Sequence, residues 1–152
     1  VTDVGANAKM NEFAAIMGLC NLKYIEEEIS RREKRAKYYQ QLIENIDGVR
    51  LFATNPGVKY NYAYFPIRIC ERGRAYARDQ VYDYMRESGV MVRKYFFPLV
   101  TDQACFGDKY KHSNIAVARK VSKEVLILPL YSELDLETIK DISELIIQAV
   151  QS

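Results

Sequence analysis

The sequence predicts an α/β domain in which two long N-terminal helices precede a small mixed sheet covered by helices. Two observations predict this class. Apolar residues recur at helical spacing in the first third of the chain and again near its C-terminus, whereas short β-branched and aromatic runs lie between them. The chain of 152 residues is also long enough to bury one core.

The first helix is expected over residues 10–22, directly after a Gly5-Ala6-Asn7 lead-in. It is apolar nearly all the way round, which predicts burial on several sides. Asn7 has two interpretations at this point. It is either the N-cap of the helix or a group that helps bind an anion such as phosphate, which free N–H groups at helix starts attract. The helix also carries small residues that would let another backbone approach closely: Ala14, Ala15 and Gly18.

A second, amphipathic helix is expected over residues 23–46, with little or no break after the first. The basic run at 31–37 is offset by nearby glutamates, so we interpret it as a solvated face rather than a nucleic-acid site. Asp47-Gly48 ends this helix, because glycine favours the left-handed conformation at helix C-termini. Apart from polar Arg32, alternating spacings of three and four define one stripe, with Leu42 beside it: Ile25, Ile29, Ala36, Tyr39, Ile43 and Ile46.

Strands are expected where aromatic and β-branched residues dominate. Pro66 lies inside one of them and lacks a ladder donor, which argues for an edge or a bulge there. Pro98 and Pro129 stop two others. The expected strands span residues 49–52, 62–69, 90–97 and 125–128.

Three further helices complete the pattern. One is expected over 73–88 and closed by Gly89, and a short one is capped by Ser113 or Asn114. Asp135 caps the last helix. Its apolar stripe consists of Leu136, Ile139, Ile142, Leu145, Ile146 and Val150.

Composition and simple motifs exclude several function classes. A net charge of +2 gives no argument for a nucleic-acid partner. No apolar run approaches a membrane span and nothing at the start resembles a signal peptide, so we expect a cytoplasmic protein without a membrane partner. The single His112 and three separated cysteines lack metal-ligand spacing, so no metal site is expected, and Cys20 and Cys70 are interpreted as buried thiols. Phosphate-loop, dinucleotide and nucleophile-elbow motifs do not occur.

The N-terminal stretch reads G-A-N-A-K-M-N-E-F-A-A-I-M-G-L-C-N-L. It resembles the G-x-N-x-[KR]-M-x-E-x-x-A-A-x-G-L-x-x-L signature of pyridoxal-phosphate-dependent nucleotide-sugar aminotransferases, the DegT/StrS class. Residues 61–66, 93–99 and 124–131 resemble further strands of that class, the second of them as R-K-Y-F-F-P-L. The resemblance implies the C-terminal part of a longer fold-type I enzyme. Residues 1–22 would end its large domain, and 23–152 would form its small α/β domain.

The resemblance also implies roles for individual residues. Asn7 matches the family asparagine that reaches the cofactor phosphate of the neighbouring subunit. Lys9 matches a cation of the same loop, which either lies near the phosphates of cofactor or nucleotide or is simply a solvated loop cation. Arg93 and Tyr95 match the strand that approaches the substrate. Alternation along a strand would put both, with Phe97, on one face, although ordinary core packing is the preferred interpretation of Phe97.

The implied whole enzyme moves an amino group, with glutamate as donor, onto a nucleoside-diphosphate keto-sugar, using pyridoxal phosphate as a homodimer. The family lysine that binds the cofactor covalently lies in an S-F-x-x-x-K context, which this chain lacks. We therefore expect no catalytic residue here and no activity from this chain alone. An alternative from another class is a non-catalytic helical dimerisation module, which the small residues of the first helix would also suit.

Overall fold

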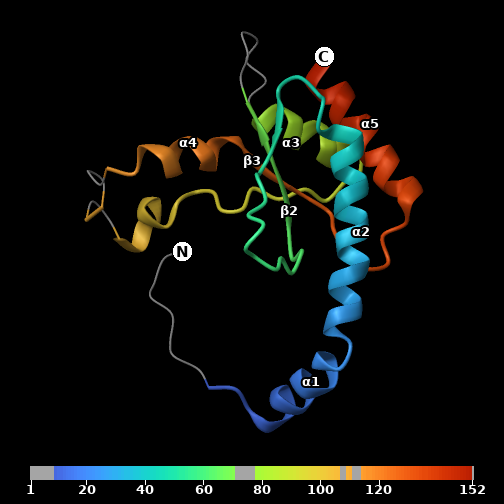
Figure 1. The fold of residues 1–152 in the computed structure, drawn as a ribbon. Helices are drawn as coiled ribbons and strands as arrows, with labels where there is room; N and C mark the ends of the chain where they lie inside the picture. The colour runs from blue at the N-terminus through green and yellow to red at the C-terminus, as the bar shows by residue number, and fades with distance from the viewer. Residues whose placement is uncertain (1–8, 71–77, 107–108, 111–113, 152) are drawn as a thin grey trace.

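A computed structural model of the chain describes residues 9–70, 78–106, 109–110 and 114–151. Two helices come first, followed by two strands, a helix, two short 3₁₀ turns, a helix, a strand and a last helix (Figure 1). Within this part of the chain the strands form one antiparallel sheet in the order β1-β2-β3. The expected α/β fold is confirmed, except that the sheet is antiparallel throughout rather than mixed.

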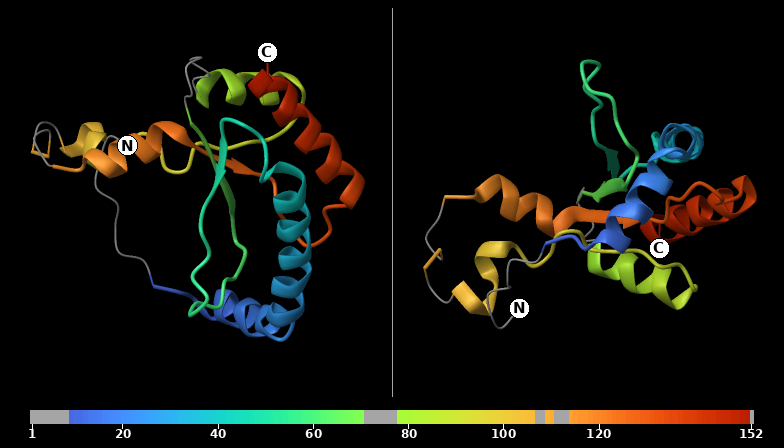
Figure 2. Two further views of the ribbon diagram at one scale, coloured as in Figure 1. Left: turned by 45° about the horizontal axis from the view of Figure 1, so that its top comes forward. Right: turned by 90° about the horizontal axis from the view of Figure 1, so that it is seen from below.

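Helix α1 (Glu12–Leu22) begins at Asn11, whose side-chain oxygen accepts a hydrogen bond from the Ala14 N–H at 2.9 Å. The capping role offered for Asn7 therefore belongs to Asn11, and Asn7 lies outside the described residues. This chain buries none of the residues of α1. The helix lies beyond the N-terminal end of α2 (Ile25–Ile43), away from the sheet, in two views (Figures 1 and 2).

Helix α2 is shorter than expected at both ends. A turn at Lys23 and Tyr24 separates it from α1, and the regular helix stops at Ile43. Gly48 adopts φ +86°, as the left-handed helix end requires, and leads the chain back into the sheet. The predicted stripe reaches the core through its C-terminal half, at Ala36, Tyr39 and Ile43.

The sheet is built by two antiparallel pairings. Strand β1 (Val49–Leu51) pairs with β2 (Phe65–Ile69), and β2 pairs with β3 (Val125–Leu128). Pro66 therefore lies in the central strand. Its pairing partner is on β3 only, because β1 ends at the residue opposite Ile67. The proline thus occupies a local edge, as its missing donor demands.

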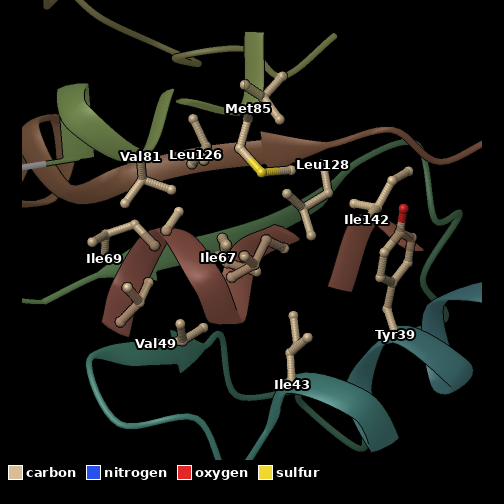
Figure 3. Packing of buried hydrophobic residues seen from close by; sticks show 14 of the residues in the cluster. Tyr39, Ile43, Val49, Ile67, Ile69, Val81, Met85, Leu126, Leu128 and Ile142 are labelled. Carbon is tan, nitrogen blue, oxygen red and sulfur yellow. The ribbon is translucent and has the colours of Figure 1, made fainter. Parts of the chain in front are cut away.

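Helices α2, α3 (Arg78–Glu87) and α5 (Leu136–Gln151) share one hydrophobic core with the sheet (Figure 3). Tyr39 is fully buried and its ring stacks on Phe65 with centroids 5.0 Å apart, so burial raises the pKa of the Tyr39 hydroxyl. Fully buried side chains come from the three helices and from the sheet: Ile43, Ile67, Met85, Leu126, Ile139 and Ile146.

The caps of the later helices were only partly predicted. Asp135 does cap α5, because the Thr138 N–H donates to its carboxylate at 2.7 Å. Helix α4 (Ala116–Glu124) instead begins at Ile115 without a side-chain cap, so Asn114 is not the cap, and Ser113 lies outside the described residues. Gly89, at φ +82°, follows α3 as expected.

The cysteines are less buried than the sequence predicts. Cys20 is exposed on α1 and Cys70 is half-buried, so the interpretation of both as buried thiols is wrong. For Cys20 the cause is the exposure of α1 itself, whose apolar surface this chain does not cover. His112 lies outside the described residues.

Candidate functional site

Residues 93–98 form a turn, which we call the 93–98 turn, and not part of the strand expected over 90–97. Arg93 makes one isolated antiparallel bridge with Ile127 of β3, with N···O distances of 3.1 and 2.8 Å. The Phe97 N–H then donates to the Lys94 carbonyl at 2.8 Å and turns the chain before Pro98. One bridge followed by a turn presents consecutive side chains at the surface.

Arg93 and Tyr95 lie together on this turn. The Arg93 guanidinium donates to the Tyr95 hydroxyl, and its Cζ lies 5.4 Å from the centroid of the Tyr95 ring. The Tyr95 ring also meets the Tyr64 ring edge-on, with centroids 5.7 Å apart. The structure thus joins these two residues, and their contact with a substrate stays a prediction.

The alternation expected beyond Tyr95 does not occur. The Phe96 ring stacks on the Tyr95 ring at 4.9 Å instead of pointing to the opposite face. Phe97 is 45% exposed, so its assignment to the core is wrong. Its ring lies against the guanidinium of Arg78, whose Cζ is 4.8 Å from the ring centroid. A turn, unlike a strand, has no period of two.

Two hollows flank Arg93. The larger, of about 550 Å³, lies between the 93–98 turn and α3 and includes Tyr82, Arg86 and Val100. The smaller, of about 300 Å³, opens toward Tyr64 and the residues after β3. A guanidinium offers planar donors suited to phosphate, and exposed aromatic faces offer stacking surfaces for flat rings. The arrangement therefore has the chemistry of a site for an anionic ligand with a ring.

A charged network at the start of α3 supports the turn from beneath. Asp79 Oδ1 accepts from Arg78 Nε at 2.7 Å and from Lys94 Nζ at 2.6 Å. The hydrogen bond from Lys94, followed by the charge of Arg78, holds the pKa of Asp79 below its usual value against partial desolvation. Sequence reasoning missed Arg78 and Asp79, because neighbouring opposite charges on a helix usually mark a solvated surface.

The other predicted site residues are not brought to this turn. Lys9 is exposed in the extended residues ahead of α1, and α1 lies at the far end of α2 from the sheet (Figure 2). Asn7 is outside the described residues. In the described part of the chain, no group of three or more His, Cys, Asp or Glu side chains could hold a metal ion. No helix there is both long and apolar enough to span a bilayer.

Comparison with known proteins decides the family. The profile of the DegT/DnrJ/EryC1/StrS aminotransferase family matches residues 1–147. The chain belongs to this family. Its members are dependent on pyridoxal phosphate.

Individual proteins of known activity or structure support the family assignment of this chain. The chain is 36% identical over 149 residues to dTDP-4-amino-4,6-dideoxy-D-glucose transaminase from Escherichia coli, an alignment that covers 97% of this chain and 40% of the relative. The crystal structure of DesI, solved with its TDP-sugar product, matches 97% of this chain and 38% of DesI with a TM-score of 0.85 and 26% identity. The chain spans about 40% of the length of such relatives.

A more distant structure shares the fold alone. It is an E. coli GDP-4-keto-6-deoxy-D-mannose-3-dehydratase that holds hydrated pyridoxal phosphate, at 18% identity, with a TM-score of 0.77. The match covers 93% of this chain and 36% of the dehydratase. The α/β arrangement described above is therefore a segment of the DegT-family fold, homologous to part of nucleotide-sugar aminotransferases.

Proposed function

We propose that this chain is the C-terminal segment of an aminotransferase that acts on a keto-sugar carried by thymidine diphosphate, with glutamate as amino donor. The observation that carries the proposal is the 36% identity over 149 residues to a dTDP-amino-sugar transaminase. The match runs through the 93–98 turn as well as the N-terminal motif, since it covers 97% of the chain. The 93–98 turn and the N-terminal residues predicted to bind the cofactor therefore both lie inside the aligned region.

The residues present fit an outer contact to pyridoxal phosphate and not a complete cofactor site. Lys9 is exposed in the extended residues just before α1, where cations and helix N–H groups suit a phosphate. No S-F-x-x-x-K sequence occurs in the chain. When bound, the cofactor supplies an electron sink for the carbon that gains or loses the amino group. In this proposal Asn7 donates to its phosphate from the neighbouring subunit and Lys9 offsets the phosphate charge.

On the substrate side, Arg93 and Tyr95 contact the nucleotide sugar. The guanidinium of Arg93 borders both hollows and is oriented by the Tyr95 hydroxyl. That orientation leaves its other donors available for the diphosphate. The exposed ring of Phe96 extends the aromatic surface beside it.

The homodimer is a further part of this proposal, with α1 as its contact. The helix exposes large apolar side chains, including Phe13 at 80% and Met17 at 61%, which ordinary monomers avoid in such density. Apart from the adjoining backbone of α1 itself, no atom in the described part of the chain lies within 4 Å of a Cβ built at Gly18, so a second helix could approach closely there. Light scattering of the chain should give about twice the monomer mass of 17.6 kDa. The double change Phe13→Asp and Met17→Asp should give the monomer mass, and a monomeric unchanged chain would refute the contact.

The activity itself is tested on the full-length protein that contains this segment. We expect it to convert dTDP-4-amino-4,6-dideoxy-D-glucose and 2-oxoglutarate into the keto-sugar and glutamate. The assay measures the glutamate that is formed. The 152-residue chain alone should form none, and borohydride reduction with pyridoxal phosphate should label no single lysine stoichiometrically. If the full-length protein forms no glutamate while the chain still dimerises, a non-catalytic dimerisation module becomes the better function.

Asn7 provides the sharpest single-residue test, with Asn11 as its control. A hydrogen bond to an anionic phosphate contributes about 1.5–3 kcal/mol, so Asn7→Ala should weaken cofactor binding roughly ten- to a hundredfold. Asn11→Ala removes the cap of α1 instead and should lower helix stability by about 1 kcal/mol without that loss. Mixing Asn7→Ala subunits with subunits lacking the cofactor lysine should restore partial activity, because one site of each hybrid dimer is intact. Equal effects of the two asparagine changes on cofactor affinity would exclude the phosphate role.

A further inference from the structure

The 93–98 turn is fastened to the rest of the chain at three points. Its backbone pairs with β3 at Arg93. The side chain of Lys94 reaches Asp79 at 2.6 Å, and its Nζ lies 4.0 Å from the centroid of the Tyr82 ring. The ring of Phe97 packs against Arg78. The residues that point outward from the turn are flanked by side chains that are fixed to α3.

Arg78 makes the largest number of contacts among these residues. It is 3% exposed, although arginine is almost never fully buried without partners. Its Nη1 donates to the carbonyl of Ser122 at 3.2 Å and of Val125 at 3.1 Å, at the C-terminal end of α4. Carbonyls at a helix C-terminus lack partners within the helix and favour a cation. Arg78 therefore ties together α3, the end of α4 and, through Phe97, the 93–98 turn.

Asp79 couples Arg78 to the turn. The same carboxylate oxygen accepts from Arg78 and from Lys94, so one anion holds both cations. Such a pair fixes direction as well as distance when one partner is buried, because Arg78 cannot move away from its carbonyl partners without leaving them unpaired. Because Lys94 binds the same carboxylate, its position is also restricted. Lys94 is the direct sequence neighbour of both Arg93 and Tyr95.

We propose that Arg78 and Asp79 are positioning residues which, through Lys94 and Phe97, set the angle at which Arg93 and Tyr95 meet the nucleotide sugar. The inference rests on the proposed contact of Arg93 and Tyr95 with the substrate. Neither positioning residue touches the substrate. Loss of the network leaves the backbone bridge at Arg93 in place and lets the outward side chains drift, which lowers affinity for the nucleotide sugar and leaves the amino-acid donor unaffected.

The test uses the full-length enzyme and the conservative variant Asp79→Asn. We expect the KM for the nucleotide sugar to rise about tenfold while the KM for the amino-acid donor stays unchanged, since a small misplacement of a binding group has effects of this size. Equilibrium dialysis with thymidine diphosphate alone should show the same loss. The matched control is Glu124→Gln, which breaks the partly buried Arg68–Glu124 pair outside the network and should leave both KM values unchanged.

A double change separates positioning from general stability. On an Arg93→Gln background, Asp79→Asn should add little further loss, because both changes act through one group. Lys94→Met keeps a long side chain beside Tyr82 but loses the charge that contacts the ring and Asp79, so it should reproduce the effect of Asp79→Asn. It replaces Asp79→Asn in the test if Asp79→Asn folds poorly. Additive losses, parallel changes in both KM values, or an equal effect of Glu124→Gln would overturn the inference.

Different results would refute the substrate contact of Arg93 and the positioning role of Arg78 and Asp79. If Arg93→Gln changes the nucleotide-sugar KM but Asp79→Asn and Lys94→Met do not, the positioning role is wrong and the proposed function stands. If Arg93→Gln itself leaves that KM unchanged, both the substrate contact and the positioning role are wrong. Arg78→Lys should give an intermediate loss, because lysine keeps the charge but cannot reach two carbonyls and stack on Phe97 at once.

Discussion

Helices α1 and α5 are both rich in apolar residues, yet they have opposite environments. In α5 the apolar residues form one stripe, and Ile139, Ile142 and Ile146 are buried against the core. In α1 apolar residues lie on all sides and none is buried. The difference shows that a one-sided stripe, rather than apolar content, matches a helix to a sheet face. A helix that is apolar all round needs more surface than this chain offers it.

The largest expected effect comes from shortening an apolar side chain in each helix. Ile146→Ala should lower the free energy of unfolding by about 2–5 kcal/mol, because Ile146 is fully buried. Ile16→Ala should change it by less than about 0.5 kcal/mol, because Ile16 is 56% exposed. Urea unfolding of the 152-residue chain measures both at a concentration where it is monomeric. A comparable loss for Ile16→Ala would mean that α1 is packed against the domain.

A pair of glycines should give opposite signs. Gly48 has φ +86° and an added Cβ would lie 3.1 Å from Val150, so Gly48→Ala should destabilise the chain by about 1–2 kcal/mol. Gly18 lies inside α1 with open space around it in the single chain. At a concentration where the chain is monomeric, Gly18→Ala should therefore stabilise that helix by about 1 kcal/mol and raise the helical circular-dichroism signal. A loss of helix on Gly18→Ala would reveal a close neighbour that this chain does not contain.

The smallest expected effect concerns the caps, because α5 starts at a carboxylate and α1 at an amide. The hydrogen bonds from the Thr138 N–H and hydroxyl hold the pKa of Asp135 below its usual value. Its stabilisation is thus present above the unfolded pKa of about 3.9 and is lost as the pH falls through the lower folded pKa.

Thermal melts at pH 7 and pH 3 check this difference. Asp135→Asn keeps a good cap and should remove this part of the pH dependence, whereas Asp135→Ala should lower the melting temperature at pH 7 as well. Asn11→Ala should reduce the helical signal equally at both pH values, since an amide does not titrate. A pH-dependent effect of Asn11→Ala would show that a neighbouring ionisable group contributes to the start of α1.

The elements that local pattern governs were predicted well. The stripe of α5, the cap at Asp135, the turn at Gly48 and the strand at 125–128 all follow from spacing or from one residue's conformational preference. Helix α4 was displaced, because it starts at Ile115 without the side-chain cap that the sequence suggested. Cap rules locate helix starts only where the helix uses a cap.

Sequence reasoning named two residues of the 93–98 turn but not the shape of the turn, and it missed the residues of α3 that contact it. Arg93 and Tyr95 were identified through resemblance, and they do lie together. The aromatic residues beside them have strand propensity, yet the chain turns here. In this turn Phe97 contacts Arg78 and Lys94 contacts Asp79, and these contacts join residues that are far apart in the sequence. Tertiary contacts of this kind override local propensity and leave no periodic trace in a single chain.

The single bridge between Arg93 and Ile127 has a consequence for solubility. Strand β3 is an edge of the sheet, all four of its residues are buried, and its sequence Val-Leu-Ile-Leu is uncharged. If it were unpaired and uncovered, an edge strand of this composition would be a template for pairing with another chain. The bridge occupies the middle of that edge, and Pro98 and Pro129 bound the segments on either side. Substitutions that loosen the 93–98 turn would therefore expose an aggregation-prone edge strand. Cells that make variants with such substitutions should accumulate aggregates.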